Sequence, residues 1–259
     1  MSNIIYALEN SVATITLNRP QSLNAFTDEM IRETTEAVNR AARDPAARCI
    51  VLTGAGRGFS SGQDLADIKD RGDDFSIGNH LRGGYHRLVK AIMSAEKPVI
   101  GAINGAAAGA GCGVALACDF RIASEKAFFM LAFTKIGLIP DSGVNWLLPR
   151  LIGYARAYQM ALTAERVSAQ TALGWGMVNL VAPEDQFAAL VQQTAAQFAQ
   201  GASLAYGLTK RAMLRGFDQS LEQALDYEAE LQDVAGRSAD SREGVAAFLE
   251  KRAARFTGR

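Results

Sequence analysis

The stretch from Lys97 to Asp119 constrains the fold more than any other part of the chain, because it passes from a strand pattern to a helix pattern with almost no side chains between them. The apolar run Pro98 to Ile103 is short and is bounded by Asn104-Gly105, which is typical of a buried strand. Residues 105–111 are all glycine or alanine, and the apolar spacing that follows predicts a short buried helix from about Ala110 to Ala117. The sequence therefore predicts a strand, a turn of small residues and a helix N-terminus.

The predicted helix start at Ala110 is suited to binding a ligand through its backbone. The first N–H groups of a helix have no partner within the helix and carry partial positive charge. Since no bulky side chain surrounds this point, a ligand can reach the backbone. The glycine spacing is not GxGxxG and no Walker Lys-Ser/Thr pair follows, which disfavours a nucleotide-phosphate loop. The alternative is that glycine and alanine serve only the close packing of helix on sheet.

A second turn of small residues follows the apolar run Cys49 to Leu52, where Arg57 to Leu65 reads RGFSSGQDL. Two such turns can direct two backbone N–H groups at one oxygen and form an oxyanion hole for an enolate. The stretch Ile136 to Val144 then places Asp141 in a turn ahead of a predicted helix. One carboxylate that faces two polarising amides is suited to enolisation. Alternatively, Asp141 is only the N-cap of that helix.

Composition disfavours several other classes of protein. The 259 residues fit one domain, or one domain with a small appendage, and Lys+Arg and Asp+Glu are both 27, so no global basic field favours nucleic acid. We see no signal-peptide pattern and no apolar run long enough to cross a membrane. Cys49, Cys112 and Cys118 lie in apolar runs, which predicts buried thiols in a reducing, cytoplasmic setting. His80 and His86 have no zinc-like spacing to them, so we predict no metal site, while a nucleophilic Cys-His pair stays open.

The order of elements predicts an α/β fold with a mainly parallel sheet built from βαβ units. We expect a hairpin over residues 3–18 and, besides the strand at Val99, strands at Cys49 to Thr53, Phe120 to Ala123 and Met177 to Val181. The helices expected before residue 183 are Thr27 to Arg43, Tyr85 to Ala95, Ser142 to Leu151, Tyr154 to Leu162 and residues 168–174. After it the pattern predicts only helices, at Gln186 to Gln200, Ser203 to Arg215, Ser220 to Arg237 and Arg242 to Arg255. The charged segment Ala66 to Gly84 is either a mobile loop or an irregular helical piece.

Motifs spread along the chain resemble the crotonase (enoyl-CoA hydratase/isomerase) superfamily. They are, in order, Asn18-Arg19-Pro20, Leu23-Asn24-Ala25, the run from Gly58 to Leu65, the run from Lys97 to Asp119, Gly137-Leu138-Ile139-Pro140 and the run from Glu243 to Phe248. The resemblance implies an α/β fold in which residues 1–200 form a spiral core of ββα turns. It also implies that residues 201–259 form a helical region for trimerisation or for a lid. The implied substrate is an acyl-CoA thioester, with no other cofactor, and the implied assembly is a homotrimer or a dimer of trimers.

The resemblance also implies roles for particular residues. The backbone N–H groups of Gln63 and Ala110 would hold the thioester carbonyl as it becomes an enolate, unless Gln63 is only a turn residue and Ala110 only a packing residue. Asp141 would act alone on the acyl chain by removing a proton at one carbon and returning it at another. Apolar residues near it in sequence, such as Phe133, Leu138 and Trp146, are expected to raise its pKa. The residues expected to contact the substrate are Ala25, Ser61, Gly62, Asp64, Leu65, Gly109 and Phe133.

Two departures from the family pattern bear on the reaction. Hydratases of the family use two glutamates, and the corresponding positions here are Gly113 and Phe133. Adding water to a double bond needs a base for the water and an acid for the α-carbon, which these residues cannot supply. Asp119 and Glu125 are expected to face solvent or to bind backbone groups. The apolar stripes of the last helices, with Leu221, Leu225 and Leu231 among them, predict an oligomer.

Within the superfamily, the run AFTKIGLIPDSGVNWLLPR and the end AGRSADSREGVAAFLEKR resemble most closely the isomerases of bacterial phenylacetate degradation. Those enzymes convert ring-1,2-epoxyphenylacetyl-CoA to its oxepin and can shift 3-enoyl-CoA double bonds to the 2-position. Three hypotheses follow: an acyl-CoA isomerase that uses Asp141, a hydratase with an unidentified carboxylate, and a non-catalytic CoA-thioester-binding protein. If Asp141 is not the base, the next carboxylates to consider are Asp67, Asp70, Asp73 and Asp74.

Overall fold

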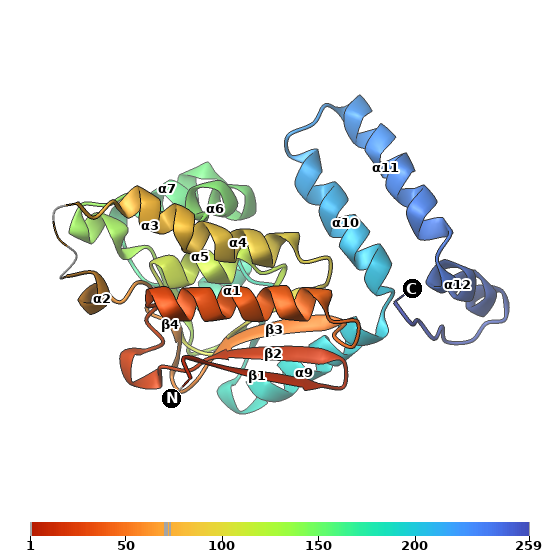
Figure 1. Cartoon of the computed structure of the whole chain (residues 1–259), viewed down its shortest axis with the longest axis horizontal. Coiled ribbons are helices and arrows are strands. Elements are labelled where there is room, and N and C mark those ends of the chain that lie inside the picture. The colour runs from red at the N-terminus through yellow and green to blue at the C-terminus, as the bar shows by residue number, and fades with distance from the viewer. Residues whose placement is uncertain (1, 70–71, 73, 259) are drawn as a thin grey trace.

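The computed structural model describes residues 2–69, 72 and 74–258, and two β-sheets organise this part of the chain (Figure 1). The larger sheet has the strand order β1-β2-β3-β5-β7-β10 and the smaller has the order β4-β6-β8-β9. The strands are β1 (Ile4–Glu9), β2 (Val12–Leu17), β3 (Cys49–Gly54), β4 (Gly58–Ser60), β5 (Val99–Ile103), β6 (Ala106–Ala108), β7 (Phe120–Ser124), β8 (Phe128–Met130), β9 (Val167–Ser168) and β10 (Leu180–Ala182).

The α-helices of the core are α1 (Asp28–Arg43), α2 (Leu65–Lys69), α3 (Ile77–Gly83), α4 (Tyr85–Ser94), α5 (Ala110–Ala117), α6 (Val144–Ile152), α7 (Tyr154–Thr163), α8 (Ala169–Gly174) and α9 (Glu184–Gln200). Those that follow are α10 (Ser203–Gly216), α11 (Leu221–Gly236) and α12 (Ala239–Leu249), and the short 3-10 helices are η1 (Pro20–Ser22) and η2 (Ala132–Ile136). Thr27, the first residue of the helix expected over Thr27 to Arg43, is the N-cap of α1, since it accepts a hydrogen bond from the Met30 N–H at 3.2 Å.

The mainly parallel sheet and the expected ββα spiral are confirmed. The β1–β2 hairpin is antiparallel, whereas β2, β3, β5, β7 and β10 pair in parallel. After each of β3, β5 and β7 the chain adds a short strand to the smaller sheet, as β4, β6 and β8. From β3 to β8, consecutive strands therefore alternate between the two sheets, and α5 directly follows the pair β5 and β6.

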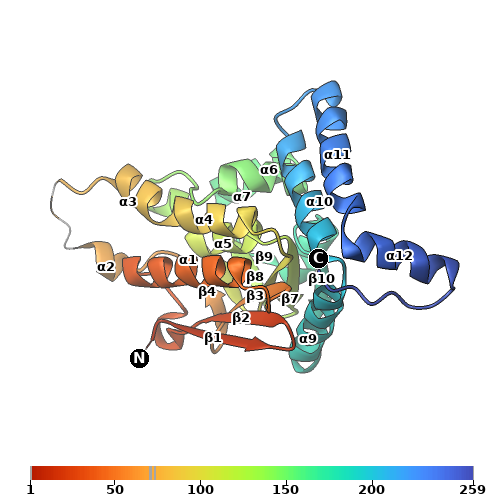
Figure 2. The ribbon, with the colours of Figure 1, turned by 45° about the vertical axis from the view of Figure 1, so that its right-hand side comes forward.

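Burial of the large sheet on both faces explains the apolar runs of its central strands. Helices α1, α4 and α5 belong to the main core on one face. Helix α9 packs against β3, β7 and β10 on the other face (Figure 2). Val191 and Ala195 belong there to one apolar cluster with Cys49, Val51 and Ile100. The three predicted buried thiols are confirmed, since Cys49, Cys112 and Cys118 are free and buried.

Several boundaries differ from those predicted. Residues 106–108 and 58–60 are short strands rather than parts of turns, because they pair with each other in the smaller sheet. The last helix spans Ala239–Leu249 and not Arg242 to Arg255, since Ser238 caps its start by accepting from the Ser241 N–H. The chain after α12 instead turns back, and the N–H groups of Thr257 and Gly258 donate to the buried Asp240 at 2.6 and 2.8 Å.

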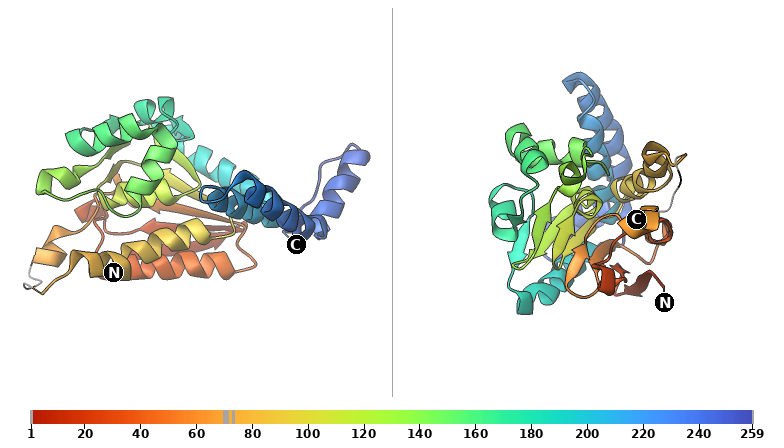
Figure 3. Two further views of the ribbon diagram at one scale, coloured as in Figure 1. Left: turned by 90° about the horizontal axis from the view of Figure 1, so that it is seen from above. Right: turned by 90° about the vertical axis from the view of Figure 1, so that its left-hand side faces the viewer.

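Helices α10 and α11 lie side by side and extend away from the sheets together with α12 (Figure 3). Leu221 and Leu225 on α11 are exposed, as expected, but Leu231 is buried, so it is no part of an exposed stripe. The segment Ala66 to Gly84 contains most of α2 and all of α3. Asp70 and Asp73, which were considered as alternative bases, lie outside the described residues.

Candidate functional site

The two turns of small residues meet at the start of α5. Gly62 has φ +99° and Gly109, the N-cap of α5, has φ +52°, conformations that favour glycine. A Cβ added to Gly62 would lie 2.8 Å from the Ala108 carbonyl oxygen and 3.3 Å from the Ala110 nitrogen. The predicted meeting of the loop before α2 with the helix start at Ala110 is therefore found in the structure.

The backbone N–H groups of Gln63 and Ala110 are both available at this junction. Within the described part of the chain, neither donates a hydrogen bond to another protein group. Their neighbours are engaged: the Gly109 N–H donates to the Met130 oxygen at 2.9 Å and the Asp64 N–H donates to the Phe26 oxygen at 2.9 Å. Two unpaired amides on adjacent turns are candidates for an oxyanion hole.

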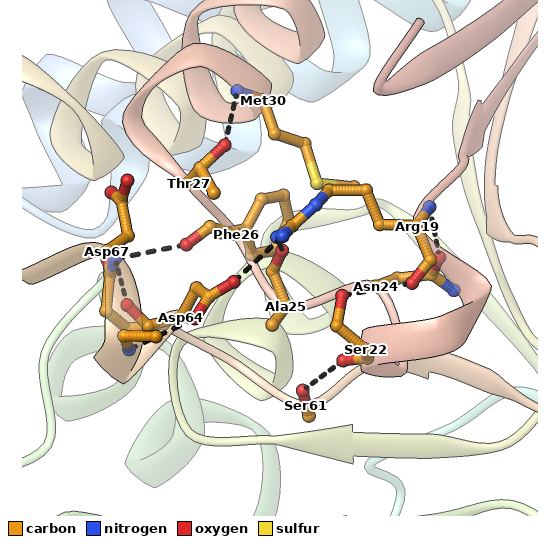
Figure 4. A network of polar contacts seen from close by, with 12 residues as sticks. Arg19, Ser22, Asn24, Ala25, Phe26, Thr27, Met30, Ser61, Asp64 and Asp67 are labelled. Atoms are coloured by element: carbon orange, nitrogen blue, oxygen red, sulfur yellow. Dashed lines mark hydrogen bonds and ion pairs between the residues drawn. The ribbon is translucent and has the colours of Figure 1, made fainter. Parts of the chain in front are cut away.

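A network around Arg19 holds the loop that carries Gln63 (Figure 4). One guanidinium nitrogen of Arg19 donates to the Ala25 oxygen at 2.6 Å, and another lies 2.9 Å from Asp64 Oδ2. The Asn24 side chain is fully buried, accepts from the Arg19 N–H at 2.9 Å and donates to the Gly58 oxygen at 2.8 Å. The Asn-Arg-Pro and Leu-Asn-Ala motifs thus act by fixing the backbone of the loop.

The other expected contact residues fall into two groups. The Ser61 hydroxyl donates to the Ser22 oxygen at 3.2 Å, and Asp64 is paired with Arg19, so both side chains are used within the loop network. Ala25 and Phe133 are buried, whereas Leu65 is 54% exposed at the start of α2. Among these expected contact residues, Leu65 thus has an exposed side chain that a bound molecule could contact.

Asp141 lies in the turn before α6 but does not cap that helix. The N-cap is Gly143, with no side-chain hydrogen bond, so the interpretation of Asp141 as a capping residue was wrong. Its carboxylate instead accepts from the Ser142 hydroxyl at 2.7 Å, and its carbonyl oxygen accepts from the Val144 N–H at 2.9 Å. Ser142 is fully buried with φ +51°, an uncommon conformation for a residue other than glycine. The surrounding fold therefore imposes this turn.

Close packing brings the Asp141 turn next to α5. A Cβ added to Gly113 would lie 2.7 Å from the Ser142 carbonyl oxygen and 3.2 Å from a methyl carbon of Val144. Gly113 is one helical turn beyond Ala110, a rise of about 4.5 Å. The turn that carries Asp141 thus packs on α5 about one helical turn from Ala110.

The expected rise in the pKa of Asp141 is confirmed. Burial raises the pKa of this carboxyl above its usual range, because removal from water disfavours the charged form. The hydrogen bond from Ser142 and the electrostatic influence of His86 and His80 lower this pKa, but by less. A carboxylate with a raised pKa is a stronger base than an exposed one.

The two positions that the resemblance assigned to the hydratase glutamates offer no proton-transfer group. Gly113 has no room for a side chain against Ser142, and Phe133 is a buried aromatic residue in η2. The expectation that Asp119 and Glu125 bind backbone groups is confirmed. Asp119 accepts from the Val99 N–H at 2.8 Å, and Glu125 accepts from the Glu184 N–H at 3.2 Å.

The thiols are poor candidates for a nucleophile. Burial raises the pKa of Cys49, Cys112 and Cys118 to about 12 in each case, so they stay protonated near neutral pH.

Among the described residues no group of three or more His, Cys, Asp or Glu side chains could hold a metal ion. A search of the same residues finds no helix with the length and apolar character needed to cross a membrane.

Tyr85 and His80 were not predicted to belong to this site, and they contact the side chain of Gln63. The Tyr85 hydroxyl and His80 Nε2 lie 2.9 and 3.0 Å from Gln63 Oε1. No local pattern could reveal this, because the partners are 22 and 17 residues apart in the chain.

Comparisons with known proteins identify one family. The family model for enoyl-CoA hydratase/isomerase matches residues 7–259. The chain is 45% identical to the 1,2-epoxyphenylacetyl-CoA isomerase of Escherichia coli strain K12, with all of both chains covered. It is 47% identical to a Rhodobacter capsulatus protein named "Probable enoyl-CoA hydratase", covering 99% of this chain and 98% of the relative. The crystal structure of an enoyl-CoA hydratase from Bacillus anthracis superposes with a TM-score of 0.92 at 31% identity, covering 100% of both chains.

Proposed function

Because the chain belongs to the enoyl-CoA hydratase/isomerase (crotonase) family and is an enzyme of that type, we propose that it is an acyl-CoA isomerase that uses Asp141 as its base. The proposed substrates are ring-1,2-epoxyphenylacetyl-CoA, converted to its oxepin, and 3-enoyl-CoA thioesters, converted to 2-enoyl-CoA. Substrate carbonyl oxygen would accept hydrogen bonds from the N–H groups of Gln63 and Ala110. No cofactor beyond the coenzyme A of the substrate is required by this scheme.

The double-bond shift needs one base and one oxyanion site. The Asp141 carboxylate takes the proton from C2 of the 3-enoyl thioester, and the electron pair moves onto the thioester oxygen to give a dienolate. The two backbone amides stabilise the negative charge on that oxygen. The protonated Asp141 then returns the proton to C4, the electrons flow back, and the double bond lies between C2 and C3. Atoms and charge balance, with no net consumption of water.

A single observation carries this proposal: Asp141, a carboxylate of raised pKa, lies on the turn that packs against Gly113 of α5. The resemblance assigns Gly113 and Phe133 to the two positions of the hydratase glutamates, and neither residue carries a carboxylate. One carboxylate supports a proton shuttle, whereas hydration by the usual family mechanism requires two. The name of the Escherichia coli relative supports the aromatic substrate. The hydratase alternative is favoured by the name of the Rhodobacter capsulatus relative.

An assay with three thioesters separates these functions. We expect the enzyme to consume ring-1,2-epoxyphenylacetyl-CoA, and to generate the 2-enoyl-CoA absorbance from 3-hexenoyl-CoA, while crotonyl-CoA keeps its absorbance. Loss of the crotonyl-CoA absorbance, with no change in 3-hexenoyl-CoA, would establish the hydratase instead. A rise in melting temperature with all three thioesters, but no turnover of any, would identify a binding protein.

The assembly and the cellular setting are further proposals. We propose a homotrimer or a dimer of trimers in which residues 201–259 provide trimer contacts or a lid over the site of the core, residues 1–200. Support comes from the exposed Leu221 and Leu225, which are 72% and 54% accessible in the single chain. We propose a cytoplasmic location on the basis of the three free thiols.

A further inference from the structure

We propose that Tyr85 is a positioning residue of the oxyanion hole, which acts through the side chain of Gln63 and is assisted by His80. The inference rests on the proposed function in that it concerns the same amide of Gln63. It gives a role to the Gln63 side chain, since the oxyanion hole itself uses only the backbone N–H of this residue.

Four hydrogen bonds hold the Gln63 carboxamide. Its Nε2 donates to the Phe26 oxygen at 3.0 Å and to the Asp64 oxygen at 3.3 Å. Because both of these partners are carbonyl acceptors, the other end of the carboxamide must be the oxygen. That oxygen lies 2.9 Å from the Tyr85 hydroxyl and 3.0 Å from His80 Nε2. A carboxamide offers two donors and two acceptor lone pairs, so its hydrogen-bonding capacity is filled.

The surroundings of Tyr85 keep its hydroxyl group protonated and therefore able to donate a hydrogen bond. Its ring is 1% exposed and packs edge-on against Phe26, with 5.8 Å between ring centroids. Burial raises the pKa of the Tyr85 hydroxyl well above its usual value, and the negative charge of Asp141 raises it further. The hydroxyl therefore stays protonated and donates to Gln63 Oε1.

The side chain of Gln63 adds to the backbone contacts that hold this loop. The Gly62 oxygen, which belongs to the same peptide group as the Gln63 N–H, accepts from the Phe26 N–H at 2.7 Å. The Gln63 Nε2 donates to the Phe26 oxygen at 3.0 Å, so backbone and side-chain contacts together set the orientation of the Gln63 N–H. A displacement of a reacting group by about 1 Å is enough to cost roughly 10²-fold in rate.

Helix α4, which carries Tyr85, also supports the base. A Cβ added to Gly143 would lie 3.3 Å from a methyl carbon of Val89 on α4. Tyr85 and Val89 are four residues apart and hence on the same side of the helix. One rigid element thus contacts both the loop of Gln63 and the turn of Asp141, and it sets the separation between oxyanion hole and base.

The test compares Tyr85→Phe with wild-type enzyme. This change removes one oxygen and keeps the buried ring. We expect kcat to fall about 10-fold to 100-fold, less than the roughly 10²–10³ for loss of a whole oxyanion donor. KM should change little, because an oxyanion contact is stronger in the transition state than in the ground state. Tyr158→Phe, on an exposed tyrosine of α7, is the matched control and should leave both constants unchanged.

A second measurement does not depend on the reaction. Infrared spectra of butanoyl-CoA labelled at the thioester carbonyl report how strongly the bound carbonyl is polarised. We expect binding to wild-type enzyme to lower the carbonyl frequency, and Tyr85→Phe to reverse part of that shift. If wild-type enzyme gives no shift, the oxyanion hole and the proposed function both fail. If the wild-type shift persists in full in Tyr85→Phe, only the positioning role fails.

Gln63→Met completes the test, because it removes the carboxamide and keeps the backbone N–H. Tyr85→Phe should have no further effect on kcat in the Gln63→Met background, since the two residues act through one contact. Additive losses, or losses of melting temperature alone, would overturn the proposal. If Tyr85→Phe does not fold, Gln63→Met alone tests the proposal. A Gln63→Met enzyme with the infrared shift and kcat of wild type would then overturn the proposal.

Discussion

Replacing Asp141 by asparagine keeps the size of the side chain and an oxygen that can accept from the Ser142 hydroxyl, but it removes the basicity. We expect kcat to fall by roughly 10²–10⁴-fold, the usual contribution of a positioned acid or base. This corresponds to about 2.7–5.5 kcal/mol of barrier. The remaining rate would come from the amides of Gln63 and Ala110, which are backbone groups and are not altered. Binding of a thioester should therefore survive.

The effect on stability follows from the pKa of Asp141. Burial raises this pKa in the folded state, so the folded protein binds more protons than the unfolded chain between the two pKa values. The stability of the wild-type protein therefore declines as the pH rises from the unfolded value, about 3.9, through the folded pKa. The neutral amide has no such decline. Asp141→Asn should thus melt at least as high as wild type at neutral pH, and this advantage should vanish towards pH 4.

The matched control is Asp119→Asn, which changes another aspartate whose pKa is raised by burial. Asp119 accepts from Lys210 Nζ and the Val99 N–H, both at 2.8 Å, and has no part in the proposed chemistry. We expect it to lower the melting temperature and to leave kcat within a few fold. The assay is the rate with 3-hexenoyl-CoA, measured with melting curves and thioester affinity on the same preparations. Activity of Asp141→Asn within a few fold of wild type would remove Asp141 from the mechanism.

Three further predictions follow from the site and the surface. Ser142→Ala removes the hydrogen bond that lowers the Asp141 pKa, so the acidic limb of the kcat/KM profile should move to higher pH. If this limb does not move, Asp141 is not the titrating base. Gly113→Glu should lower the melting temperature, because its Cβ would lie 2.7 Å from the Ser142 oxygen. It should not create crotonyl-CoA hydration, because Phe133 still supplies no carboxylate, and a large gain in hydration would contradict this prediction. Light scattering should give a multiple of the 27.7 kDa chain mass, and a single-chain mass would refute the oligomer.

The strands and helices around the site could be predicted because local sequence patterns specify them. The helix from Ala110 to Ala117 and the capped helix beginning at Asp28 are found with the expected bounds. Apolar spacing and capping residues operate over a few residues, so sequence alone reports them. The order of the elements, together with the family motifs, was enough for the ββα spiral.

Pairing between distant segments could not be predicted in the same way. Residues 58–60 and 106–108 are too short and too poor in side chains to show a strand period, and they are strands because they pair across the smaller sheet. The chain after α12 folds back onto the start of that helix, where Asp240 accepts from the N–H groups of Thr257 and Gly258. Burial of Leu231 likewise depends on how α11 is packed.

For the site, the sequence by itself determined the residue types: the small residues at the two turns, the lone Asp141, and the absence of glutamate at positions 113 and 133. Only the tertiary structure decided how these groups are oriented. It made Ser142, and not a helix N-terminus, the partner of the Asp141 carboxylate, and it joined Gln63 to Tyr85 across 22 residues. The physical reason is that a pKa and a hydrogen-bond direction depend on which distant groups share a desolvated space, and chain folding alone brings them there.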